Sequence, residues 1–137
     1  TGCNCAQSVL IQFCEEYGLP VETAQKLASG FGGGMCHGRT CGALSGAIMV
    51  LGLAQGFSGT EASPETKQNF RILVQSLVDE FHSLHGDTDC TPLLGMDLNL
   101  PGNRDLAREL NLPEERCAQY IQSSILIVKT LLNPMEK

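Results

Sequence analysis

Cysteine, histidine and glycine gather in one stretch of the chain, between Ser29 and Gly46. Cys36, His37 and Cys41 lie close together there, and only Met35 separates Cys36 from a run of three glycines. Thiols are redox groups and ligands for soft metal ions, and the positive end of a helix favours a thiolate at its start. Glycine lets the backbone approach a neighbouring group closely and adopt positive φ. The stretch therefore predicts a site for thiol redox chemistry or metal binding.

Seven cysteines are spread along the chain, and four of them lie near the ends of predicted helices. Cys5 and Cys41 each fall in the first turn of a predicted helix, and Cys117 falls early in the last helix. Cys90 follows the end of the long fourth helix. Helix ends in a bundle meet at two poles, so these thiols converge if their helix ends share a pole. Four converging thiolates would suit a tetrahedral metal ion or an iron–sulfur cluster.

The spacing of the cysteines does not by itself identify a metal. No Cys-x2-Cys pair is present, and Cys36-x4-Cys41 matches only the opening of a plant-type ferredoxin pattern. Cys36 and His37 are tentative further ligands, although a solvated loop accounts equally well for His37. Cys14 lies on the apolar face of the first helix, which favours a core role, and Cys3 is nearly terminal.

The elements that position these residues are predicted to be helices. Apolar residues recur at three- and four-residue steps, which predicts helices over about residues 4–17, 21–29, 41–54, 63–84, 104–110 and 113–133. Residues 87–103, rich in proline and glycine, are expected to be irregular. The helix over 41–54 is apolar or small on all sides, which is typical of a buried central helix. We predict an all-α fold in which residues 1–137 form a single-domain bundle of about five helices, with a glycine-rich loop before the buried central helix.

Composition and charge exclude several classes of protein. The length of 137 residues indicates one domain, and the net charge of −6 argues against a nucleic-acid partner. No apolar run reaches the roughly 18 residues of a membrane span. The odd number of cysteines and the lack of a charged-then-apolar leader favour a cytoplasmic protein, although a leader could have been removed. The small-residue helix is compatible with a homodimer.

Three segments resemble the C_GCAxxG_C_C family, whose members are described as redox-active proteins. The segments are Asn4-Cys5-Ala6-Gln7-Ser8-Val9, Gly30-Phe31-Gly32-Gly33-Gly34-Met35 and Cys41-Gly42-Ala43-Leu44-Ser45-Gly46. The resemblance spans nearly the whole chain, and it implies that the four cysteines of the pattern are Cys5, Cys41, Cys90 and Cys117. Cys3, Cys14 and Cys36 lie outside the pattern. The family is similar to a domain of split-Soret cytochromes c, where an iron–sulfur centre accompanies the haems, but the haem motif Cys-x-x-Cys-His is absent here.

Two functions follow as hypotheses, and whether the protein is an enzyme stays open. In the first, the metal ligands Cys5, Cys41, Cys90 and Cys117 bind an iron–sulfur cluster or a soft metal ion, for electron transfer or metal handling with an unidentified redox partner protein. In the alternative, the protein is a thiol–disulfide oxidoreductase without metal, with Cys41 as the low-pKa attacking thiol and Cys36 or Cys5 as the resolving thiol. A third reading, disulfides that staple an exported bundle, is disfavoured by the odd number of cysteines.

Overall fold

The computed structural model describes residues 2–59 and 62–133, and its regular elements are helices. Within these residues, β-pairing is limited to one isolated antiparallel bridge between Thr40 and Asp89. The predicted all-α bundle is therefore confirmed. The α-helices are α1 (Cys5–Leu10), α2 (Val21–Ala28), α3 (Gly42–Gln55), α4 (Pro64–His85), α5 (Cys90–Leu94), α6 (Asn103–Glu109) and α7 (Ala118–Leu132).

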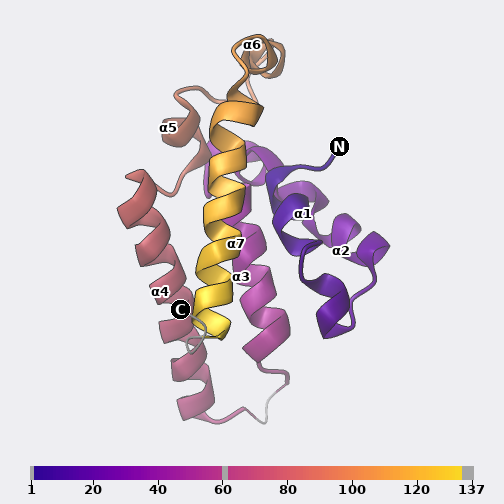
Figure 1. The fold of residues 1–137 in the computed structure, drawn as a ribbon, viewed down its shortest axis with the longest axis vertical. Helices are drawn as coiled ribbons and strands as arrows, with labels where there is room; N and C mark the ends of the chain where they lie inside the picture. The colour runs from indigo at the N-terminus through magenta and orange to yellow at the C-terminus, as the bar shows by residue number, and fades with distance from the viewer. Residues whose placement is uncertain (1, 60–61, 134–137) are drawn as a thin grey trace.

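Helix α3 is the centre of the bundle, as its composition predicted. It packs against α1, α4 and α7, and its first six residues are all buried (Figure 1). A Cβ atom at Gly46 would lie 2.7 Å from the carbonyl oxygen of Ala6, so α1 and α3 are in direct backbone contact there. Only glycine allows this approach, because any side chain at position 46 would overlap α1. The contact fixes the first residues of α1 against the first turns of α3.

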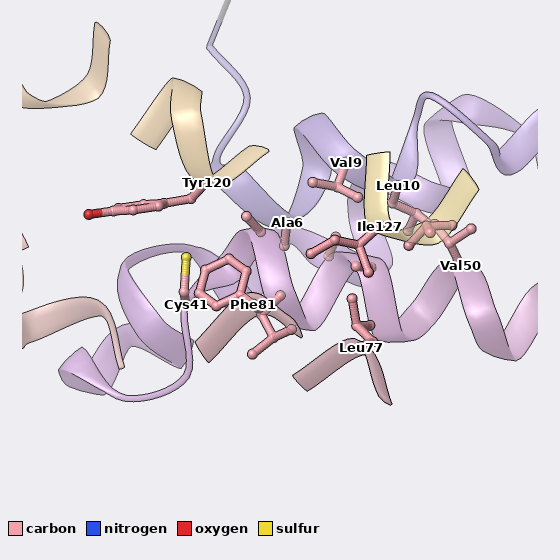
Figure 2. Packing of buried hydrophobic residues seen from close by; sticks show 14 of the residues in the cluster. Ala6, Val9, Leu10, Cys41, Val50, Leu77, Phe81, Tyr120 and Ile127 are labelled. Atoms are coloured by element: carbon pink, nitrogen blue, oxygen red, sulfur yellow. The ribbon is translucent and has the colours of Figure 1, made fainter. Parts of the chain in front are cut away.

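The core is mostly aliphatic, with α4 and α7 covering α3 on the side away from α1 and α2 (Figure 1). Leu77 and Phe81 of α4 are fully buried, as is Val128 of α7. Figure 2 shows this packing, with Cys41 and Tyr120 near one end of the cluster and Val50 and Leu10 toward the other. No helix in residues 2–59 or 62–133 combines the length and the apolarity that crossing a bilayer requires.

One buried hydroxyl within this core is predicted to reduce stability. Ser124 of α7 is fully buried, and its Oγ atom has no hydrogen-bond partner among the described residues. An unsatisfied buried polar group costs about 1–3 kcal/mol, so we expect Ser124→Ala to raise the free energy of unfolding by about 1 kcal/mol. Urea denaturation of the two proteins measures the difference. A destabilised variant would show that the hydroxyl has a partner or that its volume is needed.

The structure corrects several predicted helix boundaries. The first helix does not continue to Tyr17: α1 ends at Leu10, and a separate 3₁₀ turn covers Cys14–Tyr17 before Gly18. The last predicted helix begins with a wider π-type turn, Pro113–Cys117, and α7 ends at Leu132. Pro134, expected to follow the helix end, lies outside the described residues.

The region expected to be irregular, 87–103, contains one short helix, α5. Pro92 and Gly95 indicated a loop from the sequence. In the structure Pro92 lies in the first turn of α5, where proline is tolerated, and Gly95 has a φ of 79° at the end of α5. Cys90 is therefore the first residue of a helix rather than part of a loop.

Candidate functional site: four cysteines at one end of the bundle

Four cysteines line the same cavity, although they come from four separate segments of the chain. The cavity is mostly enclosed, has a volume of about 20 Å³ and lies where α1, α3, α5 and α7 begin. Its lining consists of Cys5, Gly33, Cys41, Gly42, Cys90, Leu93, Leu94, Leu98, Cys117 and Tyr120. The structure thus brings Cys5, Cys41, Cys90 and Cys117 together, whereas their role as metal ligands stays a prediction.

Each of the four cysteines stands at the start of a helix. Cys5 and Cys90 are the first residues of α1 and α5, and Cys41 and Cys117 immediately precede α3 and α7. Helices α1, α3 and α7 run in the same direction, and α4 runs in the opposite direction (Figure 1). Their N-terminal ends therefore meet at one pole of the bundle, and the thiols meet with them.

The thiols share the cavity without forming a ready-made metal site. Within residues 2–59 and 62–133, no three histidine, cysteine, aspartate or glutamate side chains are grouped so that they could hold a metal ion. Among the four, Cys5 and Cys117 affect each other most, because the hydrogen bond between their side chains is the main cause of the pKa shift of each. Ligation of a metal by all four sulfurs therefore requires the residues of the site to move from these positions.

A left-handed turn made from the glycine run forms one wall of the site. Gly33, Gly34, Met35 and Cys36 have φ values of 62°, 68°, 60° and 57°. A Cβ atom at Gly34 would lie 2.5 Å from the Arg39 backbone and 2.9 Å from the Cβ of Cys90. The glycines are needed for this approach, which lets the turn pass directly over Cys90.

The same turn directs its other side chains away from the cavity. Met35, Cys36 and His37 are exposed, and none of them lines the cavity. The Cys36 thiol donates a weak hydrogen bond to the carbonyl oxygen of Gly30, 3.7 Å away. The structure therefore does not bring the tentative ligands Cys36 and His37 to the other four cysteines.

The two remaining cysteines also lie apart from the cavity. Cys14 is fully buried in the core, as its position on the apolar face predicted, and its thiol donates to the carbonyl oxygen of Ile11 at 3.8 Å. Cys3 is half-buried, and its sulfur accepts a hydrogen bond from Nε2 of Gln25 at 3.6 Å. Neither residue contributes to the cavity lining.

Two residues near the start of α7 hold α5 in place, and no sequence pattern assigns either of them a functional role. The hydroxyl of Tyr120 donates to the carbonyl oxygen of Leu93 at 2.8 Å, and Nη1 of Arg116 donates to that of Leu94 at 3.0 Å. These bonds fix α5, and with it Cys90, relative to Cys117. Tyr120 lies on the apolar stripe of its predicted helix, and no local pattern distinguishes it from a core residue.

Burial keeps two thiols of the site, those of Cys41 and Cys90, protonated at neutral pH. It raises the pKa of Cys41 to about 11, although backbone N–H groups of Ala43 and Leu44 act in the opposite direction. Burial likewise raises the pKa of Cys90 to about 12. The expectation that a helix N-terminus lowers the pKa of Cys41 is therefore wrong, because desolvation of the thiolate outweighs the helix-end effect.

Cys5 and Cys117 behave as a pair. Their mutual hydrogen bond raises the pKa of Cys5 and lowers the pKa of Cys117. The first proton to leave the pair therefore comes from Cys117, and its thiolate keeps the hydrogen bond from Cys5. Cys117 is thus the thiol of this site that ionises most readily.

The raised pKa of Cys41 predicts a loss of stability of the metal-free protein in alkali. Its pKa in the fold, about 11, exceeds its ordinary value of 9.0. The unfolded chain therefore ionises at a lower pH than the folded protein. The free energy of unfolding should fall by about 3 kcal/mol as the pH rises from 9 to about 11. In urea denaturation across this pH range, the free energy of unfolding should fall less for Cys41→Ala than for Cys36→Ala. An equal fall in the free energy of unfolding of both variants would contradict the raised pKa of Cys41.

A comparison with protein families matches nearly the whole chain. The model of the C_GCAxxG_C_C family, described as "Putative redox-active protein", matches residues 3–131, a range that includes all four cysteines of the cavity. No curated protein and no solved structure matches the chain. The resemblance seen in the three sequence segments is confirmed, while the likeness to split-Soret cytochromes c stays a prediction.

Proposed function

Because the chain belongs to the C_GCAxxG_C_C family of redox-active proteins, we propose that its four cavity-lining cysteines bind a soft metal ion or an iron–sulfur cluster. The site would serve electron transfer or metal handling with a redox partner protein. The observation that carries this proposal is that Cys5, Cys41, Cys90 and Cys117, from four distant segments, line one enclosed cavity. Chance burial of thiols would scatter them through the core, as it does for Cys14.

The sulfur atoms of the four cysteines are suitable ligands for a soft metal ion or an iron–sulfur cluster. Four thiolates are the ligands of tetrahedral zinc and iron sites and of iron–sulfur clusters, and a bound iron would supply a one-electron couple. Cys41 and Cys90 are only 4% and 7% exposed, whereas Cys5 and Cys117 are half-buried, so the site is largely shielded from water. The thiols must lose their protons and turn toward the metal, so binding should release protons.

The side chain of Arg104 is a cation that lies against the wall of the cavity. Its Nη2 atom is 3.0 Å from the place that a Cβ atom of Gly33 would occupy, and Gly33 lines the cavity. The positive charge of Arg104 also favours the thiolate of Cys90. Arg104 is thus placed to offset part of the negative charge that four bound thiolates carry.

We therefore expect Arg104→Gln to weaken metal binding about tenfold, the lower end of effects seen when groups around metal ligands are removed. Arg108→Gln is the matched control, since Arg108 lies on the same helix and its ion pair with Asp105 is exposed. Competition with a metal chelator gives both affinities. Equal affinities of the two variants would show that the charge of Arg104 does not act on the site.

A metal-free dithiol is the second candidate function, and the hydrogen bond between Cys5 and Cys117 favours it. In that function the Cys117 thiolate attacks a disulfide of a partner protein and expels one of its sulfurs as a thiol. Cys5 then displaces the second sulfur, which leaves a Cys5–Cys117 disulfide and a reduced partner. The earlier alternative with Cys41 as the attacking thiol is disfavoured, because burial raises its pKa to about 11.

Anaerobic purification followed by metal and acid-labile sulfide analysis separates the two candidates. The proposal predicts bound metal in the wild-type protein and in Cys36→Ser, whose thiol lies outside the cavity, and loss of that metal in Cys41→Ser. Protein without metal that also fails to take up added iron, zinc or copper would overturn the proposal. The dithiol candidate would then be tested by mass spectrometry for a reversible Cys5–Cys117 disulfide.

A further inference from the structure

We propose that a surface groove beside the start of α7 is the place where a partner protein reaches the four-cysteine cavity, and that the groove fits a basic segment of that partner. The groove is lined mainly by exposed residues of the Pro113–Cys117 turn and of α7, together with Leu93 of α5. This goes beyond the proposed function and holds for both candidate functions, because in each of them a partner must reach the thiols.

The groove and the cavity share a wall made of Leu93 and Tyr120. Both residues line the groove on the solvent side of this wall and the cavity with Cys117 on its other side. The hydroxyl of Tyr120 points away from the hydrophobic core and donates to the carbonyl oxygen of Leu93 at 2.8 Å (Figure 2). Tyr120 therefore has to give up one hydrogen bond for its side chain to move aside, which makes this wall suited to local opening.

The other sides of the cavity are closed by backbone contacts. Between α1 and α3, a Cβ atom at Gly42 would lie 3.0 Å from the backbone nitrogen of Ala6. The left-handed glycine turn covers another side, and the side chain of Asn99 donates to the carbonyl oxygen of Gly33 at 3.0 Å. A second groove beyond this turn shares one lining residue, Leu98, with the cavity. Entry beside α7 leaves these backbone contacts in place.

The charge of the groove favours a basic partner. Glu114 and Glu115 line the groove and are exposed, whereas the guanidinium of Arg116 donates to two carbonyl oxygens of α5. The pKa of Cys117 is lowered chiefly by its hydrogen bond with Cys5, and the charge of Glu114 acts against this shift, so the groove carboxylate is close enough to act on the site. Complementary charge steers association, so a segment rich in lysine or arginine fits this surface.

Two thiol reagents of opposite charge test the groove on the full chain after reduction and chelator treatment. The reagents are methanethiosulfonates that carry either a trimethylammonium or a sulfonate group. The Cys117 thiolate attacks the sulfenyl sulfur, forms a mixed disulfide and releases methanesulfinate. Peptide mass mapping after an acid quench follows the loss of the free Cys117 thiol. It counts the mixed disulfide together with any Cys5–Cys117 disulfide that forms from it by release of the thiol of the reagent.

The cationic reagent should react faster than the anionic reagent at low ionic strength. We expect the ratio of the two rates to fall about fivefold when Glu114→Gln and Glu115→Gln are combined. The matched control combines Glu15→Gln and Glu16→Gln, an adjacent exposed pair outside the groove with the same change in net charge. The ratio is independent of the fraction of Cys117 present as thiolate. An equal fall of the ratio in both variants would overturn the proposal, because it would reflect the net charge of the whole protein.

Tyr120→Phe tests entry through the shared wall. The variant keeps the ring and loses the hydroxyl that binds Leu93, so both reagents should react with Cys117 about fivefold faster. Tyr17→Phe is the control, because Tyr17 lies outside the groove and the cavity and should leave both rates unchanged. In urea, where the chain is unfolded, both tyrosine variants and the wild type should react equally. Unchanged rates in folded Tyr120→Phe would overturn the proposal.

Failure of this proposal and failure of the proposed function give different results. Protein that binds no metal would overturn the proposed metal function and leave these reaction rates as expected. Rates that respond neither to the groove glutamates nor to Tyr120 would overturn entry beside α7 and leave the metal function standing.

Discussion

Gly46→Ala is expected to lower the free energy of unfolding by about 2–3 kcal/mol, although alanine is the better helix former. The added Cβ atom would lie 2.7 Å from the carbonyl oxygen of Ala6 and 3.1 Å from its Cα, and both are backbone atoms of α1. Relief of the overlap requires α1 to move away from α3, which also displaces Cys5 from Cys41. Urea denaturation measures the loss of stability.

Gly52→Ala is the matched control on the same helix. A Cβ atom there meets nothing within 4 Å, so this substitution should instead raise the free energy of unfolding by about 0.5–1 kcal/mol. The two variants differ only in whether α1 lies against the glycine. If both were stabilised, the close contact between α1 and α3 would be absent from the protein in solution.

Removal of the metal is expected to have the largest effect on stability. The four proposed ligands come from four elements that are separate in the unfolded chain, so under the proposed function binding free energy becomes folding free energy. With free metal about 1,000-fold above its dissociation constant, the bound form should be more stable by about 4 kcal/mol. Thermal denaturation with and without a chelator measures the difference in Tm.

Two cysteine variants serve as controls for the effect of the chelator on Tm. Cys41→Ser should show the same Tm with and without the chelator, because its site is incomplete. Cys36→Ser should respond like the wild type, since Cys36 is exposed and outside the cavity. A chelator effect that persists in Cys41→Ser would place the metal elsewhere in the protein.

The features that the sequence predicted correctly are those with local causes. Helical periodicity predicted the long helices, and Ser63 and Gly86 marked the two ends of α4, where Ser63 accepts a hydrogen bond from the Thr66 N–H. The glycine run indicated close backbone approach, and Gly34 indeed lies against Cys90. These signals depend on residues within a turn or two of one another, so tertiary structure did not override them.

The features that the sequence did not predict depend on tertiary contacts. Helix α5, which carries Cys90, forms in a region expected to be irregular and is held by Tyr120 and Arg116, whose partners are more than twenty positions away. The pKa of Cys41 depends on how completely other elements bury it, and that burial reversed the direction expected from its helix position. The exposure of Cys36 and His37 follows from a left-handed turn that includes two residues other than glycine. No sequence pattern predicted this turn.

X-ray absorption spectroscopy of the metal-loaded protein tests the central claim most directly, because it counts and identifies the atoms bound to the metal. The claim that Cys5, Cys41, Cys90 and Cys117 form one site predicts four sulfur neighbours around each metal ion and no nitrogen or oxygen neighbour. A spectrum with nitrogen neighbours, as His37 would supply, or with fewer than four sulfurs would contradict it.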